Sequence, residues 1–385
     1  MQVLSIVTAI AALAAIGYYL LCLYAIRDFQ GAKGEPASFS PGVSILKPLR
    51  GTDPGMYEAF RSHCLQDYPE YELIFGVSDP ADPAAELVKR LQSEFPDRAI
   101  KLVICPVLLG TNGKVSSLAH QVKEARYDYL IVNDSDIKVP PDYLRRVLAP
   151  FADPQVGMVT CLYRGIPGRT LGSHLEAIGI DTDFSASVLA ARVVQGVKFG
   201  LGSTLAFRRS DLGQIGGFES LVDYLADDYQ LGARIAALGR QVVVSDLVVD
   251  HHLPDYSLPE FFHHQTRWAR AIRDSRKLDY IGLAVTFGVP WALLTVGFAK
   301  ARMWSLVVLA LTLILRYAMA AMMTAQVLRQ RLSFLDYLLI PVRDIAALFV
   351  WIASFAGHTI HWRGLKFTLK NGKLYPSEAS ERPIT

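Results

Sequence analysis

The sequence predicts an α/β protein with a doubly wound domain and transmembrane α-helices. Three observations carry this prediction. Short apolar segments alternate with amphipathic segments between about residues 40 and 275, as expected for a parallel sheet covered by helices. Long apolar stretches lie toward both ends of the chain. The apolar run Tyr129–Val132 is followed closely by two acidic residues, as at the ligand-binding edge of such a sheet.

Composition excludes some classes of function. Hydrophobic residues make up 51% of the 385 residues and charged residues only 19%, which is more apolar than an ordinary soluble enzyme. The net charge of +3 is too small to indicate a nucleic-acid partner. The four cysteines are widely spaced, so we expect reduced cysteines on the cytosolic side. Nothing in the sequence indicates an oligomeric state.

The first apolar stretch predicts a membrane anchor. Val3 to Ile26 carries no charge and is long enough to cross the hydrocarbon as a helix. A cleaved signal peptide is the alternative, but no basic region precedes the stretch. Arg27 and Lys33 follow it, so the positive-inside rule places the N-terminus outside. We expect an anchor over residues 1–30 and a cytosolic domain over residues 40–275.

The predicted domain alternates strands and helices. The strands are Val43–Leu46, Glu72–Val77, Leu102–Cys105, Tyr129–Val132 and Gln241–Ser245, and the helices include Met56–Cys64, Ala84–Glu94, Ser116–Ala125 and a helix that runs to Leu238. In such sheets ligands bind beyond the carboxyl ends of the parallel strands. Polar residues that follow these strands are therefore candidate site residues.

Asp134 and Asp136 follow the strand that ends at Val132. Because they stand at positions i and i+2, their carboxylates point the same way. A hard cation such as Mg²⁺ or Mn²⁺ on these carboxylates could take its remaining ligands from a diphosphate. The alternative is a solvated turn before Pro140.

Two further segments fall at the same predicted edge. Asp79 follows the second strand and could accept a hydrogen bond from a base or ribose, or could cap a turn. The loop Gly110–Lys114 opens a helix and could offer backbone N–H groups and one ammonium to phosphate. The loop lacks the spacing of a Walker motif.

Asp227 and Asp228 open the helix that runs to Leu238. Acids at a helix start usually complement the helix dipole, and only one of the two is needed for that. A carboxylate near a metal-bound diphosphate is also where a general base belongs. His251 and His252, after the last predicted strand, could add a metal ligand, although we expect ordinary loop histidines.

The order of these motifs resembles the ceramide glucosyltransferase family, the family-21 branch of the family-2-like glycosyltransferases with the GT-A (nucleotide-diphospho-sugar transferase) fold. The resemblance extends from about residue 40 to Gly364. It rests on Val43–Gly51, Asp79, Asp134-Ser-Asp136, Asp228 and His264-Gln-Thr-Arg267-Trp268.

The resemblance implies a UDP-sugar donor. Asp79 would contact the uridine, and Asp134 and Asp136 would engage the diphosphate through Mg²⁺ or Mn²⁺. Lys47 and Lys114 would also lie on the nucleotide-sugar side.

The resemblance also implies how the acceptor is handled. Asp228 would be the catalytic base, and Arg267 with Trp268 would steady the diphosphate and the acceptor. His264 and Asp227 would lie on the acceptor side.

Two departures from the family bear on the acceptor. His264 stands where the family has Gln or Arg. The chain reads Phe184–Ser187 where ceramide-specific members carry a His, whereas Phe199–Thr204 looks closer to bacterial hopanoid-pathway relatives. The apolar stretch Leu171–Val194 could form an acceptor wall that faces the membrane, or a buried helix of the soluble domain.

The C-terminal third predicts more membrane helices. Apolar stretches of spanning length are Tyr280–Ala299, Trp304–Leu328 and Phe334–Ile360, within residues 276–362 and before a tail over residues 363–385. If all three crossed, the basic tail would end outside, against the positive-inside rule. We expect the stretch interrupted by Pro290 to be re-entrant or interfacial.

We therefore expect a multi-pass membrane enzyme of the bacterial inner membrane, with its catalytic domain in the cytosol. It would be an inverting glycosyltransferase that moves glucose or N-acetylglucosamine from a UDP-sugar to a lipid hydroxyl. A hopanoid polyol ranks ahead of ceramide as the acceptor. The alternatives are a processive polysaccharide synthase, which needs more spans, and a non-enzymatic nucleotide-binding subunit, which lacks a Walker loop.

Overall fold

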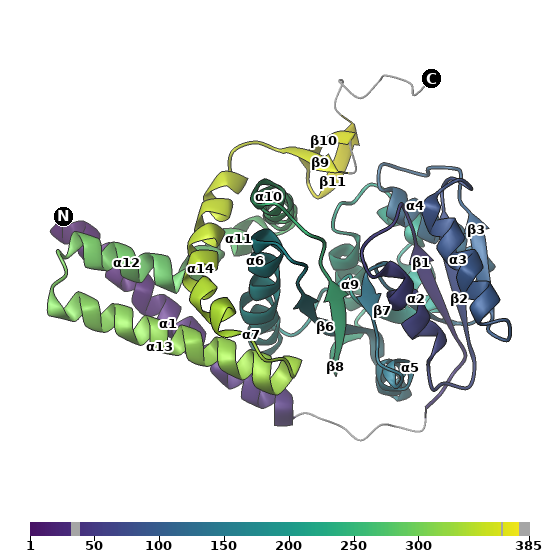
Figure 1. Ribbon diagram of the computed structural model, residues 1–385, viewed down its shortest axis with the longest axis horizontal. Coiled ribbons are helices and arrows are strands. Elements are labelled where there is room, and N and C mark those ends of the chain that lie inside the picture. The colour runs from purple at the N-terminus through teal and green to yellow at the C-terminus, as the bar shows by residue number, and fades with distance from the viewer. Residues whose placement is uncertain (32–38, 363–364, 377–385) are drawn as a thin grey trace. The chain divides into compact units, whose positions relative to one another are not determined.

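The computed structural model describes residues 1–31, 39–362 and 365–376, which form two compact units (Figure 1). The helical unit comprises Met1–Lys33, Pro167–Gly196 and Asp255–His361, and the α/β unit comprises Gly34–Ile166, Val197–Pro254 and Trp362–Thr385. Lys33, which entered the prediction of topology, lies outside the described residues, as do residues 363–364 and 377–385 of the predicted tail.

The α/β unit is built on an eight-stranded sheet in the order β3-β2-β1-β4-β7-β6-β8-β5 (Figure 1). Its strands are β1 (Val43–Pro48), β2 (Tyr71–Val77), β3 (Ile100–Ile104), β4 (Tyr129–Val132), β5 (Ile137–Lys138), β6 (Val156–Ile166), β7 (Leu205–Arg208) and β8 (Gln241–His252). The first four of these in sheet order are parallel, as predicted. β7 is antiparallel to both β4 and β6, so the second half of the sheet is mixed.

The helices of this unit confirm the predicted alternation. They are α2 (Met56–Cys64), α3 (Pro83–Glu94), α4 (Gly113–Glu124), α5 (Tyr143–Leu148), α8 (Arg209–Gln214) and α9 (Asp227–Ala237). α4 begins earlier than predicted because the Asn112 side chain caps it, accepting a hydrogen bond from Val115 N at 3.2 Å. This cap places Lys114 in the first turn of α4.

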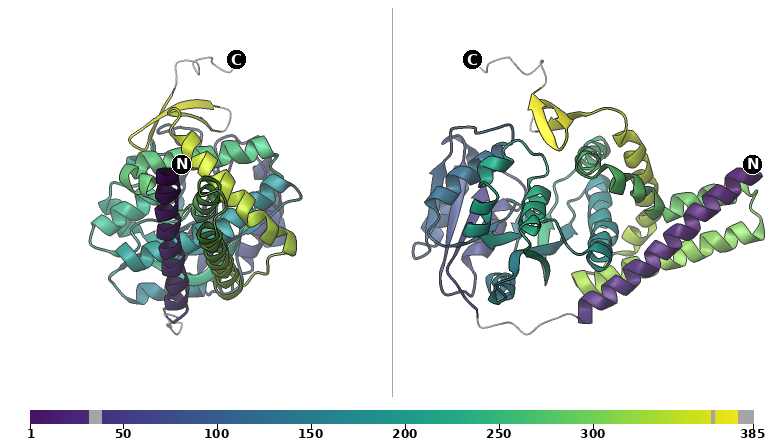
Figure 2. Two further views of the ribbon diagram at one scale, coloured as in Figure 1. Left: turned by 90° about the vertical axis from the view of Figure 1, so that its left-hand side faces the viewer. Right: turned by 180° about the vertical axis from the view of Figure 1, so that it is seen from behind.

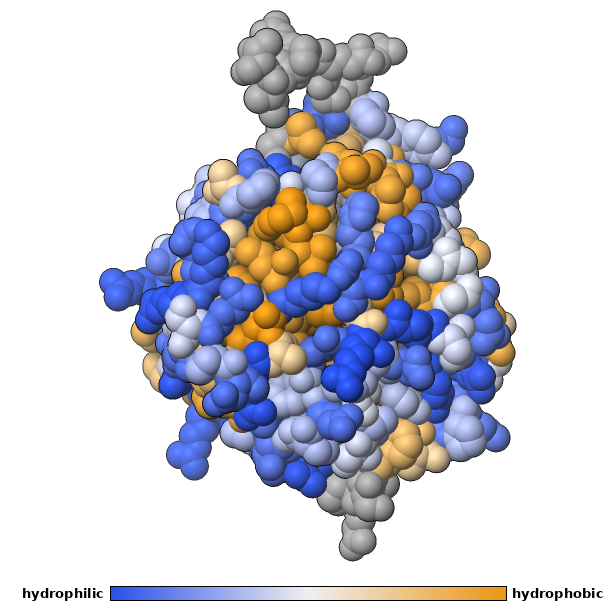
Figure 3. All heavy atoms as spheres, turned by 90° about the vertical axis from the view of Figure 1, so that its right-hand side faces the viewer, coloured by the Kyte–Doolittle hydropathy of each residue, from blue (hydrophilic) through white to orange (hydrophobic). Residues whose placement is uncertain are grey.

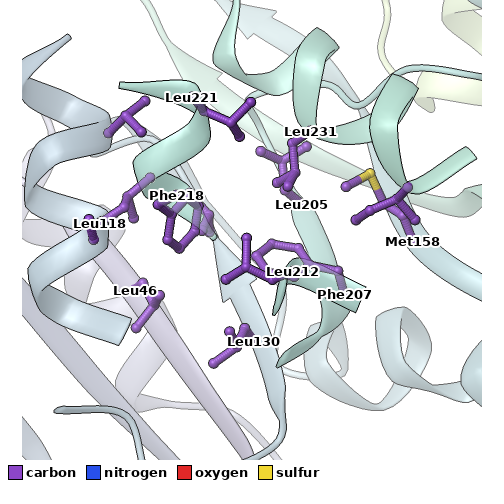
Figure 4. Close-up of a cluster of buried hydrophobic side chains, with 14 of the residues drawn as sticks. Leu46, Leu118, Leu130, Met158, Leu205, Phe207, Leu212, Phe218, Leu221 and Leu231 are labelled. Atoms are coloured by element: carbon purple, nitrogen blue, oxygen red, sulfur yellow. The ribbon is translucent and has the colours of Figure 1, made fainter. Parts of the chain in front are cut away.

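A buried apolar cluster fixes the sheet against the helices of this unit (Figure 4). Leu46 from β1 and Leu130 from β4 lie in one cluster with Leu118 from α4. Phe207 and Phe218 meet edge to face, with ring centroids 6.1 Å apart. Burying each such side chain stabilises the fold by roughly 1.5–3 kcal/mol. The strand ends that carry the polar residues are thus held rigidly.

One edge of the sheet is partly apolar. Figure 3 shows a hydrophobic patch bordered by hydrophilic residues on the face that carries β3 in Figure 1. On β3 and the segment after it, the exposed large apolar side chains are Ile104, Val107, Leu108 and Leu109. Lys101 of the same strand is exposed and ion-paired with Glu124. A charge on an edge strand disfavours pairing with another sheet.

The helical unit is formed from three separate segments of the chain. Its α-helices are α1 (Gln2–Gly31), α6 (Leu171–Gly179), α7 (Ser185–Gln195), α10 (Leu258–Ser275), α11 (Lys277–Gly282), α12 (Gly288–Phe298), α13 (Met303–Met322) and α14 (Phe334–Ser354). α1 packs against α7, α12 and α13, whereas α14 packs against α6 and α10 (Figure 2). The stretch proposed as an acceptor wall, Leu171–Val194, therefore clusters with the apolar helices and not with the sheet.

In the part of the chain that the structure describes, three helices are long and apolar enough to cross a membrane: Gln2–Gln30, Met303–Leu328 and Phe334–Ser354. A bent pair, Lys277–Thr286 and Gly288–Phe298, raises the number to four if it forms one span. The two helices of this pair meet at an angle of 57°.

Two details of the predicted apolar stretches were wrong. The stretch Tyr280–Ala299 breaks at Phe287, between the two bent helices, and not at Pro290. Pro290 lies in the first turn of α12, where proline is tolerated. The last helix ends at Ser354, and Ile360 belongs to the strand β9 (Thr359–Trp362). Gly357 adopts a positive φ of 91° between the two elements, which ends the helical path.

An ion pair is buried among the apolar helices. Arg316 is 2% exposed, and its guanidinium donates two hydrogen bonds to Asp344, at 2.9 and 2.8 Å. It also donates to the Thr182 hydroxyl at 3.0 Å. This bidentate geometry offsets the cost of removing both charges from water.

Replacing Asp344 by Ala should leave Arg316 buried without its partner. We expect Asp344→Ala to destabilise the protein in detergent by about 3–5 kcal/mol, measured by thermal unfolding. The matched control is Asp279→Ala, because Asp279 is 62% exposed in its ion pair with Arg276 and should matter little. Equal stability of the two variants would contradict the importance of the buried pair.

Candidate functional site

The candidate site lies at the carboxyl edge of β1 and β4 in the α/β unit. Leu46 of β1 pairs with Val132 of β4, so Lys47 and the Asp134 segment come from neighbouring strand ends. β2 lies on the other side of β1 and ends just before Asp79. Parallel pairing therefore brings the predicted residues of three strands to one edge.

Two lysines hold Asp134 in place. Lys47 is fully buried, and its Nζ donates to the Asp134 carbonyl oxygen at 3.0 Å. Burial lowers the pKa of Lys47 to about 7, although Asp136 and Asp134 oppose the shift. In this conformation Lys47 acts on the Asp134 backbone, and its contact with a nucleotide sugar stays a prediction.

Lys114 joins the acids of β4 and α9. Its Nζ lies 2.7 Å from Asp134 Oδ1 and 3.4 Å from Asp227 Oδ2. Burial opposes the charged form, but the carboxylates of Asp134 and Asp227 outweigh it and raise the pKa of Lys114. The predicted phosphate-binding lysine is therefore a fixed positive charge between two carboxylates.

Asp228 is held by backbone N–H groups on both oxygens. Gly202 N donates to Oδ2 at 3.0 Å, and Tyr229 N donates to Oδ1 at 2.7 Å. Burial, followed by the charge of Asp227, raises the pKa of Asp228 to about 6. A carboxylate with this pKa is a stronger base than an ordinary aspartate and is still ionised at neutral pH.

Gly202 lies between the two acidic groups of the site. A Cβ at this position would lie 2.8 Å from Asp134 Oδ2 and 3.5 Å from Asp228 Oδ2. Only a hydrogen fits there without moving a carboxylate. The sequence marked the turn Phe199–Thr204 as glycine-rich but did not indicate which glycine contacts the acids.

The second acid of the Asp-x-Asp pair has a histidine partner. His251 Nε2 lies 3.1 Å from Asp136 Oδ2, and His251 pairs with Ile137 across the sheet. The prediction of a loop for His251 and His252 was wrong, because β8 continues to His252. Among the described residues Asp136 Oδ1 is buried with no hydrogen-bond partner.

Asp136 Oδ1 is thus a candidate ligand for a cation. Burial opposes ionisation of Asp136, but His251 and then Lys47 lower its pKa, so the carboxylate is charged. Within the described ranges no three His, Cys, Asp or Glu side chains are placed to hold a metal by themselves. A cation at Asp136 would therefore need oxygen ligands from a bound substrate.

Asn133, which sequence reasoning missed, anchors the end of β4. It is fully buried, and its amide donates to Tyr143 Oη at 2.9 Å and to the Ser203 carbonyl at 2.7 Å. These bonds tie the Asp134 segment to the glycine turn. The sequence signal that could have identified Asn133 is its position as a polar residue directly after the buried apolar run.

Asp79 is exposed after β2. Its Oδ1 accepts a hydrogen bond from Ala81 N at 2.8 Å, so the turn cap, one of the two interpretations of this residue, is present. Asp82, not Asp79, caps α3. A contact of Asp79 with a base or ribose stays a prediction.

Three predicted residues belong to α10 in the helical unit. His264 stacks on Tyr256 with ring centroids 5.3 Å apart, and its ring lies 4.9 Å from that of Trp268. Arg267 lines a pocket of about 240 Å³ formed by α10 and β9. The pocket also contains His263, His361, Arg270 and Phe262, so its wall is cationic and aromatic.

Glu176 supports this helix and was not singled out from the sequence. It is 1% exposed, and its Oε2 accepts from Gln265 Nε2 at 2.7 Å. Its Oε1 lies 3.4 Å from His264 Nδ1. Arg343 donates to Gln265 Oε1 at 3.1 Å and continues the network. An acid within an apolar stretch was the signal.

The predicted site residues therefore belong to two different units. The α/β unit brings together Lys47, Lys114, Asp134, Asp136, Asp227 and Asp228. The helical unit holds His264, Arg267 and Trp268.

The chain is similar in sequence to known glycosyltransferases over nearly its whole length. The sequence model of glycosyl transferase family 21 matches residues 7–375. Ceramide glucosyltransferase 1 of Caenorhabditis elegans is 24% identical over 365 residues, covering 91% of this chain and 76% of the relative. Ceramide glucosyltransferase 3 of the same organism is 26% identical over 383 residues, covering 94% and 83%.

A solved structure supports the fold. The mannosyltransferase of Pyrobaculum calidifontis, in complex with GDP-Man and Mn2+, has a TM-score of 0.58 and 21% sequence identity. The match covers 91% of this chain and 99% of that one. The predicted GT-A-like α/β fold is confirmed.

Replacing Gly202 by Ala tests the spacing of the two carboxylates. The added Cβ should displace Asp134 or Asp228, and we expect hydrolysis or transfer of a nucleotide sugar to fall by about 10²-fold, as for small misplacements of catalytic groups. The matched control is Gly213→Ala, since a Cβ at Gly213 meets nothing within 4 Å. Release of nucleoside diphosphate by both variants provides the measurement. Near-normal activity of Gly202→Ala would show that the site tolerates the methyl group.

Proposed function

Because the chain belongs to glycosyl transferase family 21, we propose that it moves glucose or N-acetylglucosamine from a UDP-sugar to the hydroxyl of a membrane lipid. Its family makes it a ceramide glucosyltransferase-like glycosyltransferase, an enzyme that transfers a sugar to a lipid. The observation that carries the proposal is the position of Gly202 between Asp134 and Asp228. This proximity supports Asp228 as a base beside the carboxylates proposed to engage the diphosphate.

In this proposal Asp228 is the general base. It takes the proton of the acceptor hydroxyl while that oxygen bonds to the anomeric carbon of the sugar. The bond from this carbon to the diphosphate breaks, UDP leaves with the electron pair, and the configuration inverts. The two backbone N–H groups on Asp228 fix its orientation, and its raised pKa suits proton abstraction near neutral pH.

On the donor side, Lys47, Lys114, Asp134 and Asp136 would surround the diphosphate and Asp79 would contact the uridine. Asp134 and Asp136 would hold Mg²⁺ or Mn²⁺, and the buried Asp136 Oδ1 without a partner among the described residues fits a cation. When bound, the cation offsets the negative charge that grows on the leaving diphosphate. The mannosyltransferase with Mn2+ supports this assignment as a structural relative.

On the acceptor side, we propose a bulky lipid alcohol, with a hopanoid polyol ahead of ceramide. The stretch Leu171–Val194 clusters with the apolar helices, which supports an apolar acceptor wall. The ceramide-type His is absent from Phe184–Ser187. Arg267 and Trp268 would steady the diphosphate and the acceptor, and His264 and Asp227 would lie on the acceptor side.

We also propose that the protein is a multi-pass protein of the bacterial inner membrane with the α/β unit in the cytosol. The three candidate spans and the bent pair support this topology. Two routes bring the tail back to the cytosolic side: either the bent pair is re-entrant, or α14 lies in the interface. If the three candidate spans all cross the membrane, a re-entrant bent pair returns the tail to the cytosolic side.

The proposed function is tested by offering purified enzyme UDP-glucose and UDP-N-acetylglucosamine, each with ceramide and with a bacteriohopane polyol. Release of UDP and formation of a one-sugar glycolipid from the polyol are expected. Efficient glucosylceramide formation without a hopanoid product would overturn the ranking of acceptors. A polymeric product would indicate a processive synthase, and absence of UDP release with all four pairs would contradict the proposed donors and acceptors.

Asp228→Asn should abolish transfer and leave UDP-sugar binding within about twofold, because the shape of the side chain is kept and its basicity is lost. With the native residue, kcat/KM should fall about tenfold per pH unit below about pH 6, where Asp228 takes up a proton, and should level off above pH 7. The exposed Asp97→Asn serves as the control. Near-normal turnover of Asp228→Asn would move the role to Asp227 or elsewhere.

Removal of divalent cations should stop the reaction. Excess chelator should reduce UDP release to background, and Mg²⁺ or Mn²⁺ should restore it, because Asp134 and Asp136 are proposed to hold the cation. Asp136→Asn should raise the Mn²⁺ concentration for half-maximal activity by about tenfold or more. Full activity in chelator would remove the metal from the proposal.

The topology can be tested with single cysteines. Tyr375 is 48% exposed, and all four native cysteines are buried, so Tyr375→Cys adds an accessible thiol. In sealed, right-side-out vesicles we expect Tyr375→Cys to resist an impermeant thiol reagent until lysis. Gln2→Cys, near the N-terminus, should label without lysis. Ready labelling of Tyr375→Cys would place the tail outside.

A further inference from the structure

The last described segment of the chain is a hairpin that belongs to the α/β unit. Strands β10 (Leu365–Lys370) and β11 (Lys373–Pro376) are antiparallel, with Lys370 paired to Lys373. The two turn residues, Asn371 and Gly372, both have positive φ, 51° and 76°. Asn-Gly is the preferred pair for such a two-residue turn. The hairpin is therefore specified by its own sequence.

β11 pairs with the segment that leads into α9. Leu374 N donates to the Asp223 carbonyl at 2.8 Å, and Leu225 N donates to the Gly372 carbonyl at 3.0 Å. Tyr224 and Lys373 form the bridging pair between these bonds. The paired segment ends at Leu225, two residues before Asp227.

Thr111 joins the loop before α4 to the same junction. Thr111 N donates to Asp223 Oδ1 at 3.1 Å. The Thr111 hydroxyl lies 3.2 Å from Asp223 Oδ1 and 3.2 Å from the Leu374 carbonyl, and it can donate to either. Gly110 permits this approach, because a Cβ there would lie 2.6 Å from Val222 Cγ2.

Asn112 adds a second connection between the two loops. Its N donates to the Val222 carbonyl and its Nδ2 to the Tyr224 carbonyl, both at 2.7 Å. Because Asn112 also caps α4, the junction sets the position of the first turn of that helix. Lys114 lies in this turn, two residues beyond the junction.

We propose that the β10–β11 hairpin is a positioning element of the donor site, with Thr111 and Asp223 as the positioning residues through which it acts. The inference rests on the proposed function and adds to it. The junction joins the loops that lead to Lys114 in α4 and Asp227 in α9, whose charged groups lie 3.4 Å apart. If the loops separate, Lys114 can no longer pair with Asp134 and Asp227 together. The diphosphate then loses a positively charged side chain that is held in a fixed position.

The polar bonds of the junction are suited to a test because they lie outside the apolar core. Thr111 and Asp223 are only partly buried, so water can replace a lost hydroxyl bond. A substitution there should therefore change the position of the loops without unfolding the unit.

The first experiment compares Thr111→Val, Thr111→Ser and the control Thr368→Val. Thr368 lies exposed on β10 of the same hairpin, so its replacement makes the same chemical change away from the junction. We expect Thr111→Val to raise the KM for the UDP-sugar about five- to tenfold, with the acceptor KM and Tm unchanged. Thr111→Ser, which keeps the hydroxyl, and Thr368→Val should behave like the native protein.

A second variant weakens the junction by a substitution in the hairpin. Leu374→Pro removes the N–H that bonds to the Asp223 carbonyl, so the donor KM should rise at least as far as with Thr111→Val. If both KM values rose together with a fall in Tm, the junction would be merely structural and the inference would be overturned.

Hydrogen exchange separates this inference from the proposed function. The amides of residues 113–116 and 226–230 should exchange faster in Thr111→Val than in Thr368→Val. Equal exchange in the two variants would overturn the positioning role whether or not the enzyme is active. Faster exchange in a protein that consumes no UDP-sugar would support the junction and contradict the proposed function.

Discussion

Electrostatic balance among four carboxylates at one edge of the sheet is the constraint on which the site depends. Asp134, Asp136, Asp227 and Asp228 would repel one another in a partly buried region. Lys114 lies between Asp134 and Asp227, His251 contacts Asp136, and buried Lys47 supports the backbone of Asp134. Burial and the charge of Asp227 raise the pKa of Asp228 although Lys114 opposes them, whereas His251 and Lys47 outweigh burial and lower the pKa of Asp136. The same cluster therefore contains a carboxylate with a lowered pKa, Asp136, and one with a raised pKa, Asp228, that suits proton abstraction.

The path of the chain connects this edge to the helical unit. The chain leaves the α/β unit after β6 and again shortly after β8, and it returns before β7 and at the final hairpin. β6 and β8 are parallel neighbours, so both departures begin from the same edge of the sheet. The α/β unit thus supplies the polar groups, and the departing segments supply apolar helices.

The parallel half of the fold could be predicted because local patterns specify it. The helix Met56–Cys64 was predicted with its observed bounds, and Asp134 and Lys114 were expected at one edge because strand ends and helix starts meet there. The length of β8 could not be predicted, since Asp246 and Asp250 interrupt its apolar pattern although the strand continues to His252.

Other features depend on contacts between distant residues. The importance of Gly202 comes from its closeness to two carboxylates of other segments. That of Glu176 comes from its hydrogen bond with a side chain of α10, 89 residues away. The spacing of residues along the chain does not predict such long-range contacts. Sequence patterns therefore predicted the acidic residues of the site. They did not predict residues such as Gly202 and Glu176, whose roles depend on long-range contacts.

The buried pair of Arg316 and Asp344 bears on how the protein is made. A helix that carries an arginine near its centre enters a bilayer less readily, by about 2.5–3.5 kcal/mol on insertion scales. The compensating Asp344 is synthesised 28 residues later, beyond the short connection between α13 and α14. The ion pair can therefore form only after α14 has been made. An arginine in α13 thus depends, for its compensation, on a helix that follows it in the chain.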